Sequence, residues 1–354
     1  MADVGTVRQF DVTTPPHLAG AAFEDAVRRD ARKLKEELIR QTLQDASSWS
    51  RSVEDKWANA HPGEAPIYAI PHEEVEQYRE RVRTEDFEWI IPSFERYLVP
   101  DPDQFNPLID SLRYVEALFT GRTDANGAWI GAGDQLGRIN DVRTDLDEWA
   151  GKFKDSFVDS FVTPLQGTIP NHGELARITG EQMKLTKVIY IRQRQSVLDL
   201  LANGIKATQA LSNGACSAED ACKWASIALV VVGTVAGALA PGWGVLGAAL
   251  FMEVSGTVSG GLVPQAKEEQ TVPLAAPTAT EVASNIANAM SRLSTDISLM
   301  EEKASDALRE LSRVAEKHRM KAVGENASGP FSVAVPELAY ATPAQISVGL
   351  KPDV

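Results

Sequence analysis

A run of 29 residues between Lys223 and Glu253 contains no charged side chain, and no other feature constrains the fold of this chain as strongly. A helix of about 20 apolar residues crosses the hydrocarbon core of a bilayer, so the run is long enough to span one. The tetrapeptide Pro-Gly-Trp-Gly at 241–244 lies near its middle, and proline and glycine break helices. We therefore predict an apolar helical hairpin over 224–262 rather than one straight span.

Small residues recur four apart in this hairpin, at Gly233 and Gly237 and again at Gly256 and Gly260. That spacing lets two helices approach closely in lipid, and it serves a tightly packed hairpin in a soluble bundle equally well. The hairpin is therefore either sheltered in a bundle or released into a membrane by a conformational change. A constitutive anchor is disfavoured, because no basic cluster flanks the segment. The hairpin residues expected to contact lipid or core are Ile227, Val231, Gly233, Gly237, Pro241, Trp243 and Leu250.

The segment 280–321 has the regular spacing of a long helix with a heptad seam. Its apolar residues step alternately by four and three through Ile286, Met290, Leu293, Ile297, Met300, Ala304, Ala307, Leu311 and Val314. Such a seam needs an apolar partner, and the helix expected at 174–211 can return antiparallel to it, because the two flank the apolar hairpin. A third long helix, 18–57, is highly charged with a narrow apolar stripe, which predicts a position on the bundle surface.

These patterns predict an all-α fold, an elongated helical bundle with long antiparallel helices. The chain divides into an N-terminal helical region (1–120), a bundle that includes the hairpin (121–321) and a flexible C-terminal tail (322–354). Within the bundle we expect a helix over 130–148 and a second from 152 to about 165. Glycines and a proline at 167–173 are expected to interrupt the chain before the helix at 174–211 begins.

Composition and motifs argue against nucleic-acid binding and catalysis. The chain has 35 basic and 49 acidic residues, a formal charge of −14, which repels a phosphate backbone. Five scattered histidines form no metalloprotease motif, and neither a Gly-x-Ser-x-Gly elbow nor a phosphate-binding loop is present. The sequence at 242–247 matches the dinucleotide fingerprint literally, but its neighbours read as helices where that site needs strands. We predict a non-enzymatic protein without cofactor or metal.

Two cysteines, Cys216 and Cys222, lie six apart just before the apolar run. They are either unrelated small residues or the two ends of a local disulfide, which would need an oxidising compartment. The first 16 residues include Asp3 and Asp11 and no apolar run after a positive cluster. A Sec-type signal peptide is therefore not expected, and the protein is either cytoplasmic or secreted by a leaderless route.

A Trp-x-Gly tripeptide, Trp149-Ala-Gly151, lies between the helices expected at 130–148 and 152–165. Glycine permits the tight turn that such a connection needs. The second helix then presents Phe153, Phe157 and Phe161 at four-residue spacing, on the face expected to meet the first helix.

This turn, followed by a long helix, an apolar hairpin and a heptad helix, resembles the WXG-type proteins associated with type VII (ESX) secretion in actinobacteria. The resemblance covers about residues 130–320. It implies that Trp149 and Gly151, with Phe153 and Phe157 beside them, shape a turn presented to a partner or to the secretion ATPase. The export signal of that family, Tyr-x-x-x-Asp or Glu after the second helix, is not found there. Its one match, at 97–101, lies upstream and contains a proline.

The sequence therefore predicts a secreted, non-enzymatic interaction or structural protein of a type VII secretion system. Its expected partners are a WXG-type protein, the secretion machinery or further copies of itself, with a lipid membrane as a further contact. The alternative is a virulence protein, a component of an α-pore-forming toxin, because two long helices that flank a sheltered apolar hairpin also describe that class. In that case the hairpin at 224–262 would insert into a target membrane.

Overall fold

The fold is all-α, as predicted. The computed structural model describes residues 12–64, 71–119, 122–123, 129–130, 138–146, 149, 151–212, 223–225, 271–320, 331 and 337–349. Its helices are α1 (Gly20–Ala60), α2 (His72–Thr84), α3 (Ile90–Glu95), α4 (Asn106–Phe119), α6 (Ile139–Asp145), α7 (Lys152–Phe157), α8 (Thr163–Ser212), α11 (Ala279–Met320) and α12 (Pro343–Gly349). Shorter helical turns are η1 (Pro16–Leu18), η2 (Arg96–Leu98), η3 (Pro102–Phe105), the π-helical η5 (Val158–Val162) and η7 (Glu337–Tyr340). The strands described form two small antiparallel ribbons, β1 (Arg122–Thr123) with β2 (Trp129–Ile130) and β3 (Lys223–Ala225) with β4 (Thr271–Pro273).

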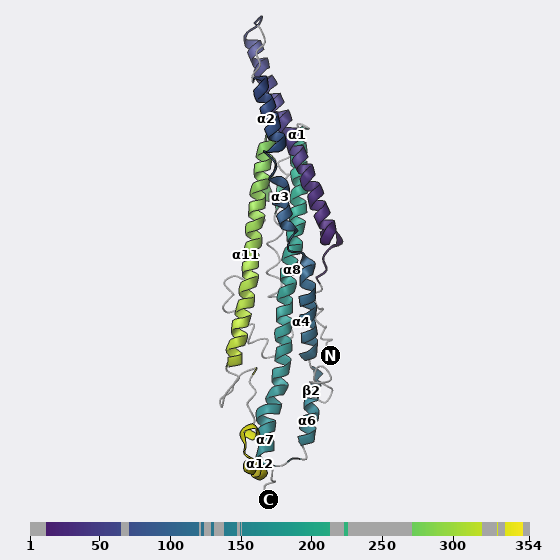
Figure 1. Cartoon of the computed structure of the whole chain (residues 1–354), viewed down its shortest axis with the longest axis vertical. Helices are drawn as coiled ribbons and strands as arrows, with labels where there is room; N and C mark the ends of the chain where they lie inside the picture. The colour runs from purple at the N-terminus through teal and green to yellow at the C-terminus, as the bar shows by residue number, and fades with distance from the viewer. Residues whose placement is uncertain are drawn as a thin grey trace, which may run out of the picture.

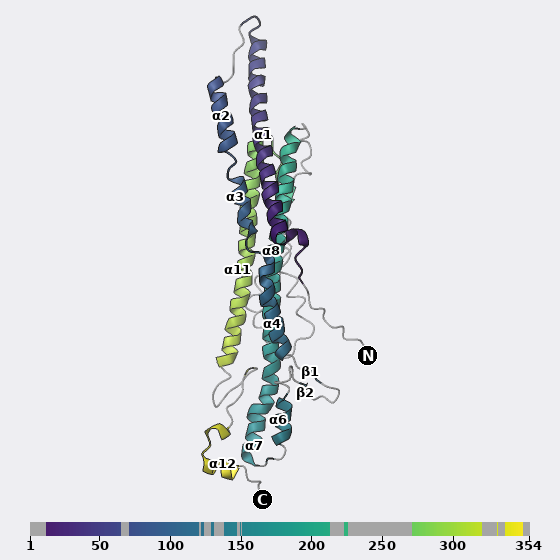
Figure 2. The same ribbon diagram turned by 45° about the vertical axis from the view of Figure 1, so that its right-hand side comes forward.

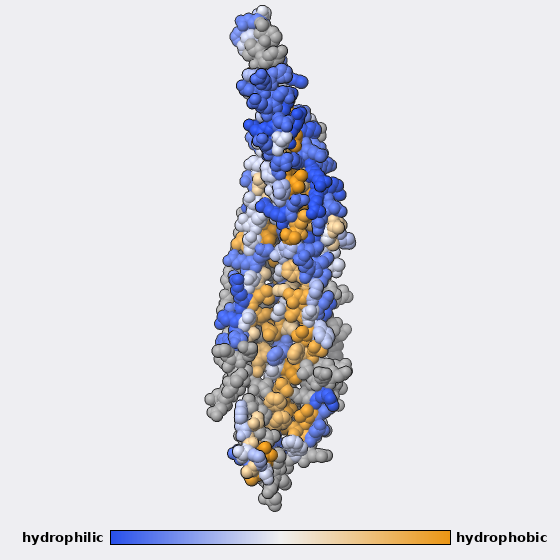
Figure 3. Space-filling view, viewed as in Figure 1, coloured by the Kyte–Doolittle hydropathy of each residue, from blue (hydrophilic) through white to orange (hydrophobic). Residues whose placement is uncertain are grey.

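Helix α8 is the axis of an elongated bundle (Figure 1). Helix α11 runs antiparallel beside it, α1 packs on both towards the end where α8 stops, and α4 packs on the other half of α8. Beyond the ends of α8 and α11, α1 continues with α2 beside it as an arm made of residues 46–60 and α2 (Figure 2). The space-filling view in Figure 3 shows that the arm is hydrophilic, while apolar side chains gather lower on the face shown, over α8.

The main core lies where α1, α3, α8 and α11 meet, and it confirms the heptad seam. The seam residues of α11 are buried, except that Ala304 is partly buried and packs against the same core. From α8 the core receives Ile189, Val197, Leu200, Leu201, Ile205 and Ala207. The predicted antiparallel pairing of these two helices is therefore present.

Helix α1 lies on the bundle surface with its charged face outward, as its narrow apolar stripe predicted. Its narrow stripe of Phe23, Val27, Ala31, Leu34 and Leu38 is fully buried against α8 and α11. A stripe of this width is sufficient because the opposite face can keep its charges in water. Residues of the predicted 1–120 region thus share one core with the predicted bundle, and residue 120 does not separate two cores.

Helix α8 runs without a break through 167–173, where an interruption was expected. Ile169 and Ala176 are buried on either side of Pro170, so packing outweighs the local preference for a break. The π-helical turn η5 precedes Pro164. A wider turn relieves the clash that a proline ring makes with the carbonyl four residues earlier.

Two other expectations from the sequence are corrected. The helix expected at 130–148 is described only as α6 (Ile139–Asp145), and Ile130 belongs to β2. The expected tail at 322–354 contains η7 and the short helix α12. The start of α12 is a capping box, in which the Thr342 amide donates to Gln345 Oε1 at 2.8 Å and the Gln345 amide donates to Thr342 Oγ1 at 3.4 Å. Pro343 at the first helical position adds to this signal.

A buried polar junction fixes the N-terminal segment and the connection between α3 and α4 against α8. Arg194 is almost fully buried and donates to the carbonyls of Leu18 at 2.7 Å and Leu98 at 3.0 Å. Burial lowers the pKa of Arg194, while the carboxylates of Asp101, Asp103 and Glu24 act in the opposite direction.

Two helical turns before Arg194 in α8, the buried Lys187 contacts Asp103 Oδ1 at 3.0 Å and Asn106 Oδ1 at 2.7 Å. Burial raises the pKa of Asp103, but hydrogen bonds from Thr14 and Lys187 outweigh it and hold that pKa below its ordinary value. The carboxylate therefore stays charged and offsets the buried ammonium group.

Gly204 of α8 packs closely against side chains of α1 and α11, which gives a test of the fold. A Cβ at this position would lie 2.9 Å from Ile286 Cδ1 and 3.5 Å from Leu34 Cδ1. We expect Gly204→Ala to lower the free energy of unfolding by about 1–3 kcal/mol, the usual effect of overpacking. The matched control is Gly180→Ala, where the nearest atom is Leu112 Cβ at 3.7 Å. Gly180→Ala should stabilise the protein by about 0.5–1 kcal/mol through helix propensity. Urea unfolding followed by circular dichroism measures both, and equal effects of the two changes would contradict the packing described.

Candidate functional site at the root of the apolar segment

The two ends of the apolar segment meet in the ribbon formed by β3 and β4. The register pairs Lys223 with Pro273, Trp224 with Val272 and Ala225 with Thr271. Ala225 and Thr271, which flank residues 226–270 in the sequence, therefore lie side by side on the bundle. We call β3, β4 and Leu274 the root of the segment.

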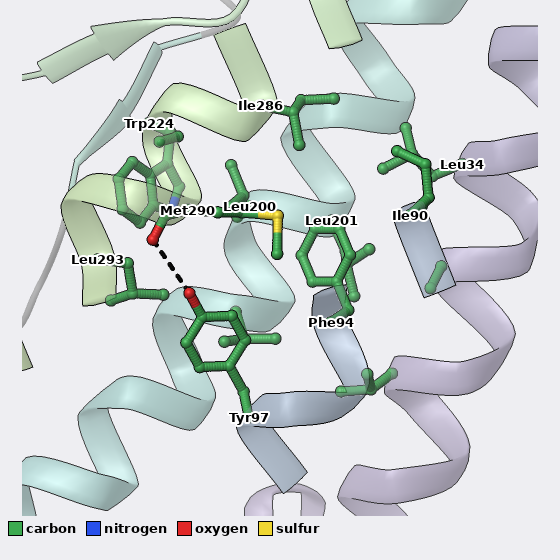
Figure 4. Packing of buried hydrophobic residues seen from close by; sticks show 14 of the residues in the cluster. Leu34, Ile90, Phe94, Tyr97, Leu200, Leu201, Trp224, Ile286, Met290 and Leu293 are labelled. Carbon is green, nitrogen blue, oxygen red and sulfur yellow. Dashed lines mark hydrogen bonds between the residues drawn. The ribbon is translucent and has the colours of Figure 1, made fainter. Parts of the chain in front are cut away.

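Trp224 fixes the root in the core. Its side chain is 1% exposed, and its indole Nε1 donates to the Ser196 carbonyl of α8 at 3.0 Å. Leu274, which directly follows β4, is fully buried in the same cluster. In Figure 4 Trp224 lies beside Leu200 and Met290, and Leu34 of α1 lies on the far side of the two long helices. The root thus covers one side of the α8–α11 layer while α1 and α3 cover the other.

A second set of bonds fixes where α8 ends and where α11 begins. Ser212, the last residue of α8, accepts from Arg40 Nη2 at 2.9 Å and also bonds to Gln41. The amide of Ala279, the first residue of α11, donates to Asp45 Oδ2 at 3.1 Å. Helix α1 therefore holds both helix ends on either side of the segment.

The interior core beside the root carries one further polar contact. Tyr97 donates from its hydroxyl to the Met290 carbonyl at 3.0 Å, and its oxygen lies 2.7 Å from Ser294 Oγ (Figure 4). Because a buried hydroxyl needs a partner, this bond fixes the position of η2 against α11.

The hairpin residues named from the sequence lie outside the described residues. These are Ile227, Val231, Gly233, Gly237, Pro241, Trp243 and Leu250, and the same holds for Cys216 and Cys222. Among the residues that are described, no helix combines the length and the apolar character needed to cross a bilayer.

The Trp-Ala-Gly turn forms the opposite end of the bundle. Gly151 adopts φ 103°, which favours glycine, and its carbonyl accepts from the Lys154 amide at 2.9 Å at the start of α7. Trp149 is 46% exposed, whereas Phe153 is buried. Phe157 and Phe161 stack with ring centroids 5.3 Å apart. The turn therefore presents its tryptophan to solvent and its first phenylalanine to the protein.

A cavity of about 730 Å³ opens beside this turn, between α7 and the segment of η7 and α12. Its lining is Lys152, Phe153, Tyr340, Ala341, Ala344, Gln345 and Val348. Within the described part of the chain, no three His, Cys, Asp or Glu residues are placed to hold a metal ion.

The root of the apolar segment and the Trp-Ala-Gly turn thus lie at different places along the bundle. The role of Trp224 was missed, since it was assigned to the hairpin, while its side chain belongs to the core. The local signal for β4 was the pair of β-branched residues Thr271 and Val272 before Pro273. Its pairing with residues almost 50 positions away has no local signature.

Comparisons with known proteins do not extend these observations. No family model matches the chain, and neither the curated proteins nor the solved structures searched include a match.

The importance of the root can be measured at Trp224. We expect Trp224→Ala to lower the free energy of unfolding by about 3–5 kcal/mol, because it empties a fully packed site. Trp224→Phe should have a smaller effect of about 1–2 kcal/mol, from the lost hydrogen bond and part of the ring. The control Trp49→Ala, at a side chain 57% exposed on the arm, should change it by less than about 0.5 kcal/mol. Urea unfolding measures these changes in the free energy of unfolding. Similar changes for Trp224→Ala and Trp49→Ala would contradict the placement of Trp224 in the core.

Proposed function

We propose that this protein is a non-enzymatic, membrane-active component of the α-pore-forming kind, whose segment 226–262 enters a target bilayer. One observation carries the proposal. The ribbon holds the two ends of the segment 226–270, which contains most of the uncharged run, side by side on the bundle, and Trp224 and Leu274 join both ends to the core. A helical hairpin needs its two ends close together, and the ribbon provides this.

The chemistry of the segment agrees with this function. The run of 29 uncharged residues is as long as one membrane-spanning helix, and in lipid a helical hairpin satisfies its backbone groups internally. A pore needs several hairpins, so the proposal includes further copies of this chain as partners. The formal charge of −14 favours zwitterionic over anionic target lipids.

Dye release from phosphatidylcholine vesicles tests the proposal between pH 5 and 7.5. The intact chain should release dye, and Val231→Asp should reduce release strongly. An aspartate at the centre of a membrane helix costs about 3 kcal/mol, which corresponds to roughly a hundredfold in insertion.

The matched control is Val348→Asp, the same change at a side chain of α12 that is 72% exposed, which should release dye like the unmodified chain. Equal loss in both variants would point to a general effect of charge. Absence of release from the intact chain, together with no flotation on the vesicles, would refute the membrane function.

A second candidate function is supported by a separate observation, the exposed tryptophan of the Trp-Ala-Gly turn. Trp149 lies on a turn formed by a glycine at positive φ, and exposed tryptophans are frequent anchors of protein interfaces. This supports the resemblance to type VII secretion proteins, in which the turn would be presented to a partner or to the secretion ATPase.

Secretion into the medium by an actinobacterial host with a type VII system tests this second function. Trp149→Ala should reduce the secreted fraction while leaving the melting temperature unchanged, because the loss of an interface anchor is about 2 kcal/mol or more. Trp49→Ala, which removes an exposed tryptophan of the arm, is the control and should leave secretion unchanged. Secretion that is the same for all three proteins would argue against the function.

A further inference from the structure

We propose that the root is a fixed hinge: when the segment 226–270 changes place, Trp224 and the ribbon of β3 and β4 stay in the bundle. This inference rests on the proposed membrane function and specifies which residues move in it. The competing mechanism is that α8 grows beyond Ser212 into the segment, which would pull β3 away from β4 and Trp224 out of the core.

The packing of Trp224 supports the fixed hinge. The indole is almost fully buried, and its nitrogen donates to the Ser196 carbonyl in the middle of α8. Leu274 contributes a fully buried side chain from the other end of the segment. Both ends of the segment are therefore held by the same core that joins α8 to α11.

The ends of the long helices support it independently. The side-chain hydroxyl of Ser212, the last residue of α8, bonds to Arg40 and Gln41 and so fixes the end of α8 on α1. Extension of α11 before Ala279 would remove the amide bond to Asp45. All three partners belong to α1, which is fixed in the core by its own buried stripe. A change that begins after Ala225 and ends before Thr271 disturbs none of these contacts.

A disulfide across the ribbon tests the hinge. Ala225 and Thr271 are directly paired, and paired residues of antiparallel strands have Cα atoms close enough for a disulfide. The variant carries Ala225→Cys and Thr271→Cys, with Cys216→Ser and Cys222→Ser to prevent other pairings. A second variant in the same background places the disulfide at the other end of the ribbon, with Lys223→Cys and Pro273→Cys.

For both variants we expect the oxidised and reduced forms to release dye from phosphatidylcholine vesicles at the same rate. Release that is lost on oxidation and restored by a reductant would show that the ribbon must open, and would overturn the fixed hinge. The reduced form is the control for the substitutions themselves.

The proposed function can fail separately. If neither the unmodified chain nor the reduced variants release dye, the membrane function is wrong. Hydrogen exchange of the unmodified chain between pH 5 and 7.5, with and without vesicles, then decides about the hinge. Amides of β3 and β4 that stay as protected as those of α8 support the hinge, and amides that exchange together with 226–262 contradict it.

Discussion

The antiparallel contact between α8 and α11 is the interaction on which the rest of the structure depends. Two long helices with apolar seams form a layer that is exposed on both sides unless other elements cover it. Helices α1 and α3 cover one side with a narrow stripe that includes Leu34, Ile90 and Phe94. Trp224 and Leu274 cover the other side (Figure 4). The root of the apolar segment is therefore part of the fold itself, and the function proposed for the segment begins beyond it.

The buried cations of α8 explain how the N-terminal segment and α4 keep one position along this helix. Apolar seams alone permit neighbouring helices to slide, because any apolar residue can replace another. Arg194 and Lys187 do not permit this, since each is buried and needs its own partners at the Leu18 carbonyl, the Leu98 carbonyl, Asp103 and Asn106. A shift of one turn would leave a buried charge without compensation, which is strongly unfavourable. The junction thus fixes the register of the N-terminal segment and of α4 on α8.

Local patterns predicted some elements, such as α11, and failed where packing with distant residues decides the structure. The heptad helix could be predicted because its apolar steps of four and three have a single structural solution, and α11 begins and ends within a residue of the expected range. The continuity of α8 through Pro170 could not be predicted, because the burial of Ile169 and Ala176 depends on packing partners far away in the chain. Trp224 was assigned to the hairpin because it lies in the same uncharged run. Within such a run, the sequence does not distinguish a tryptophan that packs in the core from one that belongs to the hairpin. The capping box at Thr342 was visible in the sequence and predicts α12 by itself.

The position of the root limits how a bilayer can meet this molecule under the proposed function. The root lies at the level of Ser196, and α8 continues from there to Ser212 for about 24 Å, with the arm of α1 beyond it. The first half of the predicted hairpin, 226–240, follows β3 directly in the sequence. As the helix that lipid requires, it would reach about 22 Å. A hairpin of this reach, held at a fixed root, does not pass either end of the bundle. The bilayer must then approach the long side of the molecule, and insertion past the end of the bundle would require the ribbon to open against the packing of Trp224.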